Sequence, residues 1–297
     1  MFISFSVQYL YGELLIRCNI LILAAILLFS SADIGATSIA WKMTGQVDQA
    51  AAIASLRKAI EQTSPYAEAQ MLFCSDFTLR RYLAARNWNL DKAKNMLRET
   101  LDWRIKFQAD EISGASVFEN GKTGKVFVSG LDLQGRPVLY MRPAMENSQM
   151  DHDGNLRHLV YNMDRAVRCM DEVNGVGKMV VVLDCHNYSA RNAPPLRTSQ
   201  ATLGILQNHY PERLGQFVII EAPWYFHLFF RAISPFIDKV TAQKILFITG
   251  KDAAARRAAL AQHFDMARFP RELYGDAELA AVFDARSYYT PEGEDLT

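Results

Sequence analysis

Met179-Val180-Val181-Val182-Leu183 is an uninterrupted aliphatic run near the middle of the 297-residue chain. A short run of this kind indicates a strand buried on both faces, as in a parallel sheet that helices cover. Two similar runs follow it, Phe217-Val218-Ile219-Ile220 and Ile245-Leu246-Phe247-Ile248. Because helical stretches separate these strands, the pattern predicts an α/β fold.

A β-hairpin is expected before these strands. Val126-Phe127-Val128-Ser129-Gly130-Leu131 and Pro137-Val138-Leu139-Tyr140-Met141-Arg142 are strand-like, and the segment between them, Asp132-Leu133-Gln134-Gly135-Arg136, has turn composition. Helices are expected at about 156–170, before Tyr210, at 224–233 and at about 253–263. The expected architecture is therefore a mixed sheet with covering helices.

The chain divides into four predicted segments. Residues 43–110 have helical spacing of apolar side chains and form a small helical N-terminal unit, and residues 120–280 form the α/β domain. Residues 281–297 are a C-terminal tail whose acidic end should fray. Residues 1–42 contain the apolar run 20–29, which as a helix spans about 15 Å, half of a bilayer's hydrocarbon core. For residues 1–42 a signal peptide, a membrane anchor and an extension outside the fold, with a start at Met43, stay open.

Charge and cysteine content exclude several classes. The 32 basic and 32 acidic residues give a net charge of zero, so we expect no nucleic-acid partner. Cys18, Cys74, Cys169 and Cys185 form no C-x-x-C pair, which argues against a zinc ribbon or a disulfide-rich scaffold. Reduced thiols in a cytoplasmic protein without metal or cofactor are the expectation.

Two short motifs suggest chemistry but have the wrong context. Gly175-Val176-Gly177-Lys178 resembles half of a phosphate loop, yet it precedes its strand, so we interpret it as a tight turn. Asp184-Cys185-His186 contains a nucleophile and a base, but neighbouring strand residues point to opposite faces. We therefore predict no catalytic residues and no enzyme activity.

The segment from Pro223 to Phe236 is strongly aromatic. It predicts a helix that is apolar around most of its circumference and bounded by prolines, and such a helix should be buried. It either fills core space or acts as a lid over a lipid cavity, with Trp224 and Tyr225 suited to a bilayer interface. The pattern alone leaves both interpretations open.

Two charged residues flank the predicted strands. Glu212 precedes the strand at 217–220, and Lys244 opens the strand at 245–248. A carboxylate that accepts hydroxyl hydrogens, together with an ammonium that contacts phosphate, suits an inositol phosphate headgroup. Taken alone, a glutamate and a lysine more than thirty positions apart are most often two solvated surface charges.

Several motifs occur in the order found in the CRAL-TRIO lipid-binding domain, which the chain resembles from about residue 67 to residue 276. They are Leu83-Ala84-Ala85-Arg86-Asn87-Trp88-Asn89-Leu90-Asp91-Lys92-Ala93, Trp103-Arg104, Asp132-Leu133-Gln134-Gly135-Arg136-Pro137-Val138, Tyr210-Pro211-Glu212-Arg213, Glu221-Ala222-Pro223-Trp224, Ser234-Pro235-Phe236-Ile237-Asp238, Val240-Thr241, Lys244-Ile245 and Pro270-Arg271-Glu272-Leu273-Tyr274-Gly275-Asp276. Pro137-Val138-Leu139-Tyr140-Met141-Arg142-Pro143 and Pro223-Trp224-Tyr225 are most similar to the phosphatidylinositol transfer branch.

The resemblance implies a CRAL-TRIO-like cavity that holds one phospholipid, phosphatidylinositol, behind a helical gate, and it favours the lid interpretation. The implied headgroup ligands are Glu212, Lys244, Arg213 and Thr241. The implied gate and cavity residues are Trp224, Tyr225, Phe229, Phe230, Phe236, Met179, Val181 and Tyr140.

The chain departs from the family pattern at a few positions. Met179 and Val181 replace hydroxyl side chains of members that also carry phosphatidylcholine, and neither can hydrogen-bond a phosphate. We therefore expect weak or no phosphatidylcholine transfer, and an apolar cavity that admits a second ligand such as a sterol. Ala84 replaces a common arginine, and Leu273-Tyr274-Gly275 replaces a glycine pair.

The resulting hypothesis is a monomeric, peripherally membrane-associated carrier that moves or presents phosphatidylinositol between membranes. One alternative is a carrier of a sterol, tocopherol or retinoid. Another is a lipid-sensing module that acts through a protein partner.

Overall fold

The computed structural model describes residues 48–62, 66–233 and 242–294. Within these residues a mixed five-stranded sheet has the order β1-β2-β3-β4-β5. The strands are β1 (Val126–Leu131), β2 (Pro137–Met141), β3 (Met179–Asp184), β4 (Leu214–Ile220) and β5 (Ile245–Ile248). The β1–β2 pair is antiparallel and the other pairs are parallel, which confirms the predicted hairpin and mixed sheet.

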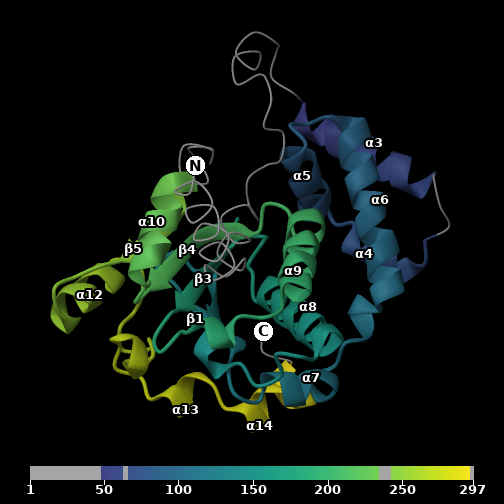
Figure 1. The fold of residues 1–297 in the computed structure, drawn as a ribbon. Helices are drawn as coiled ribbons and strands as arrows, with labels where there is room; N and C mark the ends of the chain where they lie inside the picture. The colour runs from purple at the N-terminus through teal and green to yellow at the C-terminus, as the bar shows by residue number, and fades with distance from the viewer. Residues whose placement is uncertain (1–47, 63–65, 234–241, 295–297) are drawn as a thin grey trace, which may run out of the picture.

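Helices cover both faces of the sheet (Figure 1). One face packs against α8 (His152–Arg168), α9 (Leu196–His209) and α10 (Trp224–Ile233). The other packs against α7 (Gly114–Gly121), α12 (Ala253–Leu260) and C-terminal residues that include α14 (Ala285–Tyr288). The shorter elements are η2 (Ala109–Glu111), η3 (Pro143–Met145), η4 (Ala190–Asn192), η6 (Arg271–Leu273), α13 (Leu279–Val282) and α15 (Pro291–Glu294).

The N-terminal helices form a separate cluster beside the sheet (Figure 1). They are α3 (Gln49–Glu61), α4 (Glu68–Phe73), α5 (Asp76–Ala85) and α6 (Leu90–Phe107). Asn89 caps α6, because its side chain accepts the Lys92 N–H at 2.9 Å. The fully buried Leu79, Leu83 and Leu97 lie at the helical spacing that the sequence predicts.

A buried polar junction joins these helices to the α/β domain. Arg104 of α6 pairs with Asp164 of α8 at 2.9 Å and also with Asp110. The Tyr210 hydroxyl donates to the same Asp164 at 2.8 Å. The Trp103 ring stacks on His209 at 4.1 Å between ring centroids. Charge pairing and ring stacking therefore hold α6 against α8 and the end of α9.

The described side chains of helix α10 differ in burial. Phe226 is 2% exposed and Phe230 packs on the sheet, whereas Trp224 is 70% and Leu228 49% exposed. The expectation that this helix is buried therefore holds for Phe226 and Phe230, which face the sheet, and not for Trp224 and Leu228. The side chains of Tyr225 and Phe229 lie outside what the structure describes, and so do Ser234-Pro235-Phe236 and Thr241.

The apolar run at residues 20–29 also lies outside the described residues. Within the described ranges, none of the helices combines the length and the apolar character needed to cross a bilayer.

Candidate functional site

A surface pocket of about 510 Å³ lies where α5 meets the N-terminal ends of β3 and β4. We call it the cationic pocket, and we define it by Arg80 and Arg81 of α5, Arg136, Glu172, the turn Gly175-Val176-Gly177-Lys178, and Glu212. Helices and loops from both parts of the chain therefore build its walls. Of the sequence-predicted headgroup ligands, Glu212 lines it.

Glu212 occupies a left-handed backbone conformation, with φ of +60°, immediately before β4. Its side chain is 28% exposed, and its Oε2 atom lies 3.7 Å from Lys178 Nζ. The Glu212 carboxylate is therefore open to the pocket, and in the described part of the chain its contact with Lys178 is longer than a hydrogen bond.

Arg81 is a pocket residue that the sequence interpretation missed. Its Nη1 donates to the Pro211 carbonyl at 2.9 Å, but its Nε is buried with no hydrogen-bond partner in the described part of the chain. Burial, with a contribution from Arg213, lowers the pKa of Arg81 to about 9. A half-buried cation in the wall of a pocket is well placed to bind an anion. It lies within a helix and no motif marks it.

Two further arginines are already committed to partners. Arg136 donates to Asp132 Oδ2 through Nη2 at 2.5 Å and through Nε at 2.8 Å. Arg213 is 2% exposed, pairs with Glu172 and donates to the Gly177 carbonyl at 3.0 Å. The structure therefore places Arg213 behind the pocket, as a support for the turn before β3.

Lys244 lies at the same end of the sheet but does not line the cationic pocket. Its carbonyl accepts the Phe217 N–H at 2.7 Å, at the start of the β4–β5 pairing. Glu212 and Lys244 thus come from neighbouring strands and share one sheet end.

The predicted cavity residues divide between the two faces of the sheet. Met179, Val181 and Phe230 lie on the face that α8, α9 and α10 cover. Tyr140 lies on the opposite face, where its ring stacks on Phe127 at 4.9 Å. Tyr140 is therefore misplaced in the prediction: successive strand residues alternate between faces, so its neighbour Leu139 lies on the face that α8, α9 and α10 cover.

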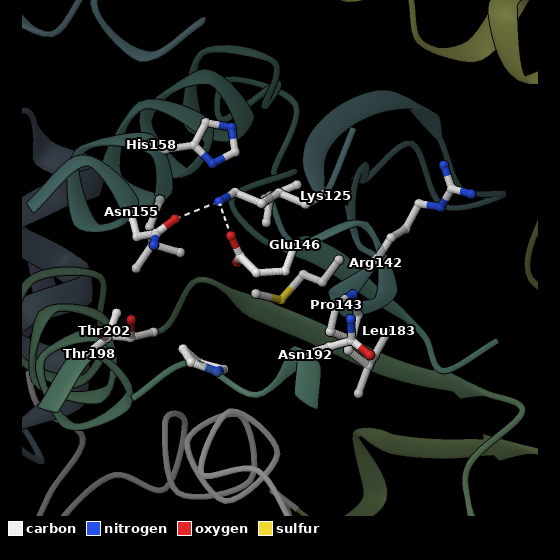
Figure 2. A pocket seen from close by; sticks show the side chains of 14 residues that line it. Lys125, Arg142, Pro143, Glu146, Asn155, His158, Leu183, Asn192, Thr198 and Thr202 are labelled. Carbon is white, nitrogen blue, oxygen red and sulfur yellow. Dashed lines mark hydrogen bonds and ion pairs between the residues drawn. The ribbon is translucent and has the colours of Figure 1, made fainter. Parts of the chain in front are cut away.

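A second cavity, of about 80 Å³, lies on the sheet face that α8 and α9 cover, near the C-terminal ends of β2 and β3 (Figure 2). Met141, Leu159 and Leu183 supply apolar walls, and Thr198 and Thr202 of α9 supply hydroxyls. Lys125 and Asn155 lie at one end of it, as Figure 2 shows. The apolar sheet face thus contains open space far from the cationic pocket.

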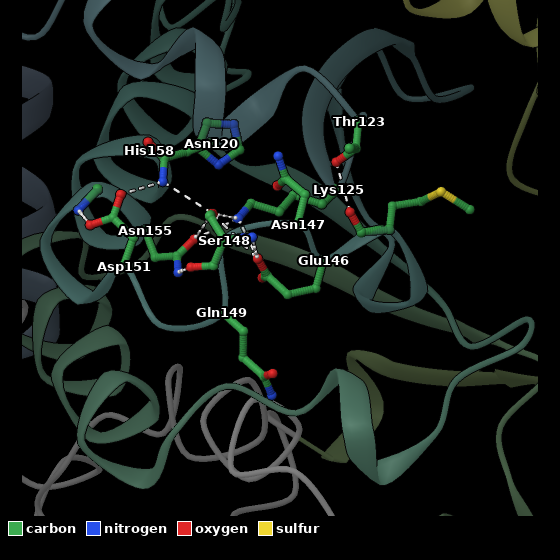
Figure 3. A network of polar contacts seen from close by, with 12 residues as sticks. Asn120, Thr123, Lys125, Glu146, Asn147, Ser148, Gln149, Asp151, Asn155 and His158 are labelled. Carbon is green, nitrogen blue, oxygen red and sulfur yellow. Dashed lines mark hydrogen bonds and ion pairs between the residues drawn. The ribbon is translucent and has the colours of Figure 1, made fainter.

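Lys125 closes this cavity through a polar network (Figure 3). Its side chain is 5% exposed, and its Nζ donates to Glu146 and Ser148 at 2.7 Å each and to Asn155 at 2.5 Å. Burial lowers the pKa of Lys125, and Glu146 opposes that shift. Because these three partners take all three ammonium donors, the lysine holds the loop before α8.

The burial of His158, in the same region, indicates that the stability of the protein depends on pH. It is 1% exposed, and its Nε2 contacts the Tyr289 hydroxyl at 2.8 Å and the Asn162 amide at 3.0 Å. Burial, with Lys125 adding, lowers its pKa to about 3. Below about pH 6.5 the histidine of the unfolded chain binds a proton, whereas His158 in the folded protein stays neutral. The free energy of unfolding therefore falls as the pH falls through that value.

We expect His158 to reduce the free energy of unfolding by about 2 kcal/mol between pH 7 and pH 5. Urea unfolding of the wild type and His158→Gln at both pH values measures this, since glutamine does not titrate. Equal pH dependence in the two proteins would contradict it.

The Asp184-Cys185-His186 segment has the geometry of a structural cluster. Burial raises the pKa of the Cys185 thiol, the reverse of an activated nucleophile. His186 Nδ1 lies 2.8 Å from Asp184 Oδ1, and Arg142 Nε lies 3.3 Å from Asp184 Oδ2. The histidine therefore pairs with the aspartate; β3 ends at Asp184, so alternation along a strand does not extend to Cys185 and His186.

Known proteins resemble the chain over most of the described region. A family model described as the CRAL/TRIO domain matches residues 121–275, and one described as the CRAL/TRIO N-terminal domain matches residues 52–99. A CRAL-TRIO domain-containing protein of Schizosaccharomyces pombe is 35% identical over 61% of this chain and 18% of its own length.

Two further relatives have more specific names. Phosphatidylinositol transfer protein PDR17 of Saccharomyces cerevisiae is 31% identical over 62% of this chain and 55% of its own length. Patellin-5 of Arabidopsis thaliana is 30% identical over 58% of this chain and 28% of its own length. The chain thus spans only 18% to 55% of these three relatives.

The fold also matches a solved structure. The crystal structure of Sfh5 superposes with a TM-score of 0.55 at 18% identity, over 69% of this chain and 82% of that one. At this identity the likeness concerns the fold alone.

Proposed function

The chain belongs to the CRAL/TRIO family, and we propose on that basis that it is a phosphatidylinositol transfer protein that moves or presents one phospholipid between membranes. The observation that carries this proposal is the cationic pocket, where the Glu212 carboxylate faces Arg81 and Lys178. The name of the PDR17 relative supports the choice of lipid. The helical unit of residues 43–110 and the lipid domain of residues 120–280 act together in this proposal.

The headgroup would be recognised by charge and by hydroxyl pairing. In the cationic pocket, Arg81 would contact the phosphate and the inositol hydroxyls would donate to Glu212. Lys244 does not line this pocket, so its predicted phosphate contact gains no support from the pocket geometry. The acyl chains would lie between the sheet face that contains Met179 and Val181 and the helices that cover it, which must move apart because both side chains are buried there. Moving acyl chains from a bilayer into an apolar space of this kind is nearly neutral in free energy, so the headgroup contacts decide specificity.

Helix α10 would be the gate. Phe226 and Phe230 face the sheet, while the exposed Trp224 and Leu228 offer an apolar surface to a bilayer. We propose that the protein works as a monomer at the cytoplasmic surface of membranes, with transient contact through this helix.

Mass spectrometry of lipids extracted from protein purified without detergent from a eukaryotic host tests the proposal. Phosphatidylinositol at close to one molecule per protein is the expected result. A sterol or another apolar molecule in its place would overturn the headgroup assignment.

The residues of β3 predict lipid selectivity. Met179 and Val181 cannot hydrogen-bond a phosphocholine phosphate, so we expect phosphatidylcholine transfer at less than about a tenth of the phosphatidylinositol rate. Met179→Ser combined with Val181→Thr should raise phosphatidylcholine transfer in a vesicle assay.

Val182→Thr is the matched control, because Val182 lies on the opposite face of the same strand. Wild-type exchange of phosphatidylcholine as fast as that of phosphatidylinositol would refute the selectivity.

A further inference from the structure

A cluster of polar side chains lies where β4 ends and helix α10 begins. Glu221 directly follows β4 and has a φ of +55°, a left-handed conformation that is uncommon for a residue other than glycine. Its carboxylate accepts a hydrogen bond from the Tyr274 hydroxyl and lies 3.0 Å from Arg256 Nε. These contacts hold the residue that links the sheet to α10, the helix proposed as the gate.

Tyr274 reaches Glu221 from the C-terminal part of the domain. It follows η6, and Arg257 Nη1 donates to its carbonyl at 2.7 Å. The next residue, Gly275, packs so closely that a Cβ atom there would lie 1.9 Å from the Phe269 carbonyl oxygen. Burial, with the hydrogen bond to Glu221 adding, raises the pKa of Tyr274. The Tyr274 hydroxyl is therefore a fixed donor that stays protonated at neutral pH.

His186 also contacts the Tyr274 hydroxyl. Its Nε2 atom lies 3.5 Å from the hydroxyl oxygen, and its Nδ1 atom lies 2.8 Å from Asp184 Oδ1. The other oxygen of Asp184 lies 3.3 Å from Arg142 Nε. The His186 side chain is 35% exposed, so it can exchange protons with solvent. The end of β3 is thus joined to Glu221 through a single tyrosine.

The long contact between His186 and Tyr274 follows from the number of hydrogens. Because Nδ1 faces a carboxylate, the neutral imidazole carries its proton there, and Nε2 has only a lone pair. The Tyr274 hydroxyl has one hydrogen, which it donates to Glu221. Two lone pairs therefore face each other across 3.5 Å. A proton on Nε2 would turn this contact into a hydrogen bond to the tyrosine oxygen.

The charged groups around His186 favour its protonation. The hydrogen bond to Asp184 raises the pKa of His186, and Glu221 adds to this shift, whereas burial and Arg256 oppose it. Because the pKa is raised in the folded protein, the stabilisation from the added proton is complete below about pH 6.5. It is lost as the pH rises through the folded-state value.

We propose that protonation of His186 completes a hydrogen-bonded chain from Asp184 through Tyr274 to Glu221, and that this chain holds the start of α10 and slows gate opening. Opening must change the backbone at Glu221, because residues at the ends of elements absorb such motions. This inference rests on the proposed function, because it adds a pH-dependent control to the gate of that function. Acidification closes the gate, and deprotonation releases it.

Hydrogen–deuterium exchange of the full chain at pH 6 and pH 8, corrected for the intrinsic exchange rate, measures the opening of α10. We expect the backbone amides of residues 224–233 to be about fivefold more protected at pH 6, as one added hydrogen bond to a charged group implies. Phosphatidylinositol transfer between vesicles should be about fivefold slower at pH 6. Global stability changes in the opposite direction, because the buried His158 destabilises the fold in acid.

Two variants test the chain at different links. His186→Gln should lose the pH dependence, because glutamine does not titrate. Tyr274→Phe should also lose it, because the ring remains but the hydroxyl that joins His186 to Glu221 is gone. The second variant keeps the histidine, so the proposal stays testable if the first does not fold.

His263→Gln is the matched control. His263 is, like His186, a half-buried histidine of the α/β domain. It follows α12, and its ring contacts Phe264, a residue outside the proposed chain. This variant should keep the wild-type pH dependence of α10 protection.

The outcomes separate this inference from the proposed function. Equal protection of α10 at pH 6 and pH 8, greater protection at pH 8, or a pH dependence that persists in His186→Gln or Tyr274→Phe overturns the inference. If such a protein still transfers phosphatidylinositol, the proposed function stands. Protection that depends on His186 and Tyr274, in a protein that transfers no phosphatidylinositol, supports the inference about α10 and overturns the proposed function.

Discussion

Glu212→Ala is expected to reduce phosphatidylinositol transfer by about a hundredfold, because two charge-assisted hydrogen bonds from ring hydroxyls are lost. The fold should survive, since the side chain is 28% exposed and its contact with Lys178 is 3.7 Å long. Alanine and glutamate pay a similar penalty for the left-handed backbone at this position, so the substitution adds no strain there. Transfer of labelled lipid between vesicles, together with urea unfolding, measures both effects.

Two comparisons make this result specific. Glu212→Gln retains a carbonyl oxygen as acceptor and should keep part of the activity. Glu119→Ala removes a glutamate that is 75% exposed and remote from the cationic pocket, and it should leave transfer unchanged. Lys244→Ala tests the assignment made from the sequence resemblance separately, because Lys244 does not line the cationic pocket. Normal transfer by both the Glu212 and the Lys244 variant would remove the headgroup assignment.

Arg104→Met is expected to lower the free energy of unfolding by about 3 to 5 kcal/mol. The Arg104 side chain is 7% exposed and pairs with Asp164, itself 20% exposed, so methionine would leave that carboxylate buried without its cation. Urea unfolding at pH 7 measures the loss. Asp164→Asn in the Arg104→Met background should recover part of it, because the uncompensated charge is then gone.

A surface pair supplies the control for this prediction. Arg57 and Asp76 contact at 2.6 Å with 36% and 72% of their side chains exposed. Arg57→Met should therefore change stability by less than about 1 kcal/mol. A loss that small in Arg104→Met would show that the junction does not depend on this ion pair.

The sheet could be predicted from sequence because its signals are local. The buried strand β3 and residues 217–220 of β4 are continuous apolar runs, and the Asp132–Arg136 turn marks the hairpin. Alternation along β2 also places Tyr140 and Leu139 on opposite faces. Which of those faces lies under α10 is decided by the packing of helices distant in sequence, so the cavity side of Tyr140 was predicted wrongly.

The pocket could be predicted only in part. The resemblance pointed to Glu212, whose motif is contiguous, and the structure places it in the cationic pocket. Arg81 became visible only through tertiary structure, because its contact with Pro211 joins residues 130 positions apart. Arg213 was also a predicted headgroup ligand, but it does not line the pocket. Its sequence neighbour Glu212 faces the pocket, whereas Arg213 is buried behind the turn at Gly177.

The Arg81–Pro211 contact also bears on how this protein can be divided for experiments. The N-terminal family match ends at residue 99, and the match to the CRAL/TRIO domain begins at residue 121. The pocket contains Arg80 and Arg81 from the first region and Glu212 from the second. A fragment trimmed to residues 121–275 would keep the sheet but lose the part of the pocket wall that α5 supplies, including Arg80 and Arg81. Such a fragment would be unsuitable for ligand screening, because weak ligand binding could then result from the missing arginines and would not measure the affinity of the full chain.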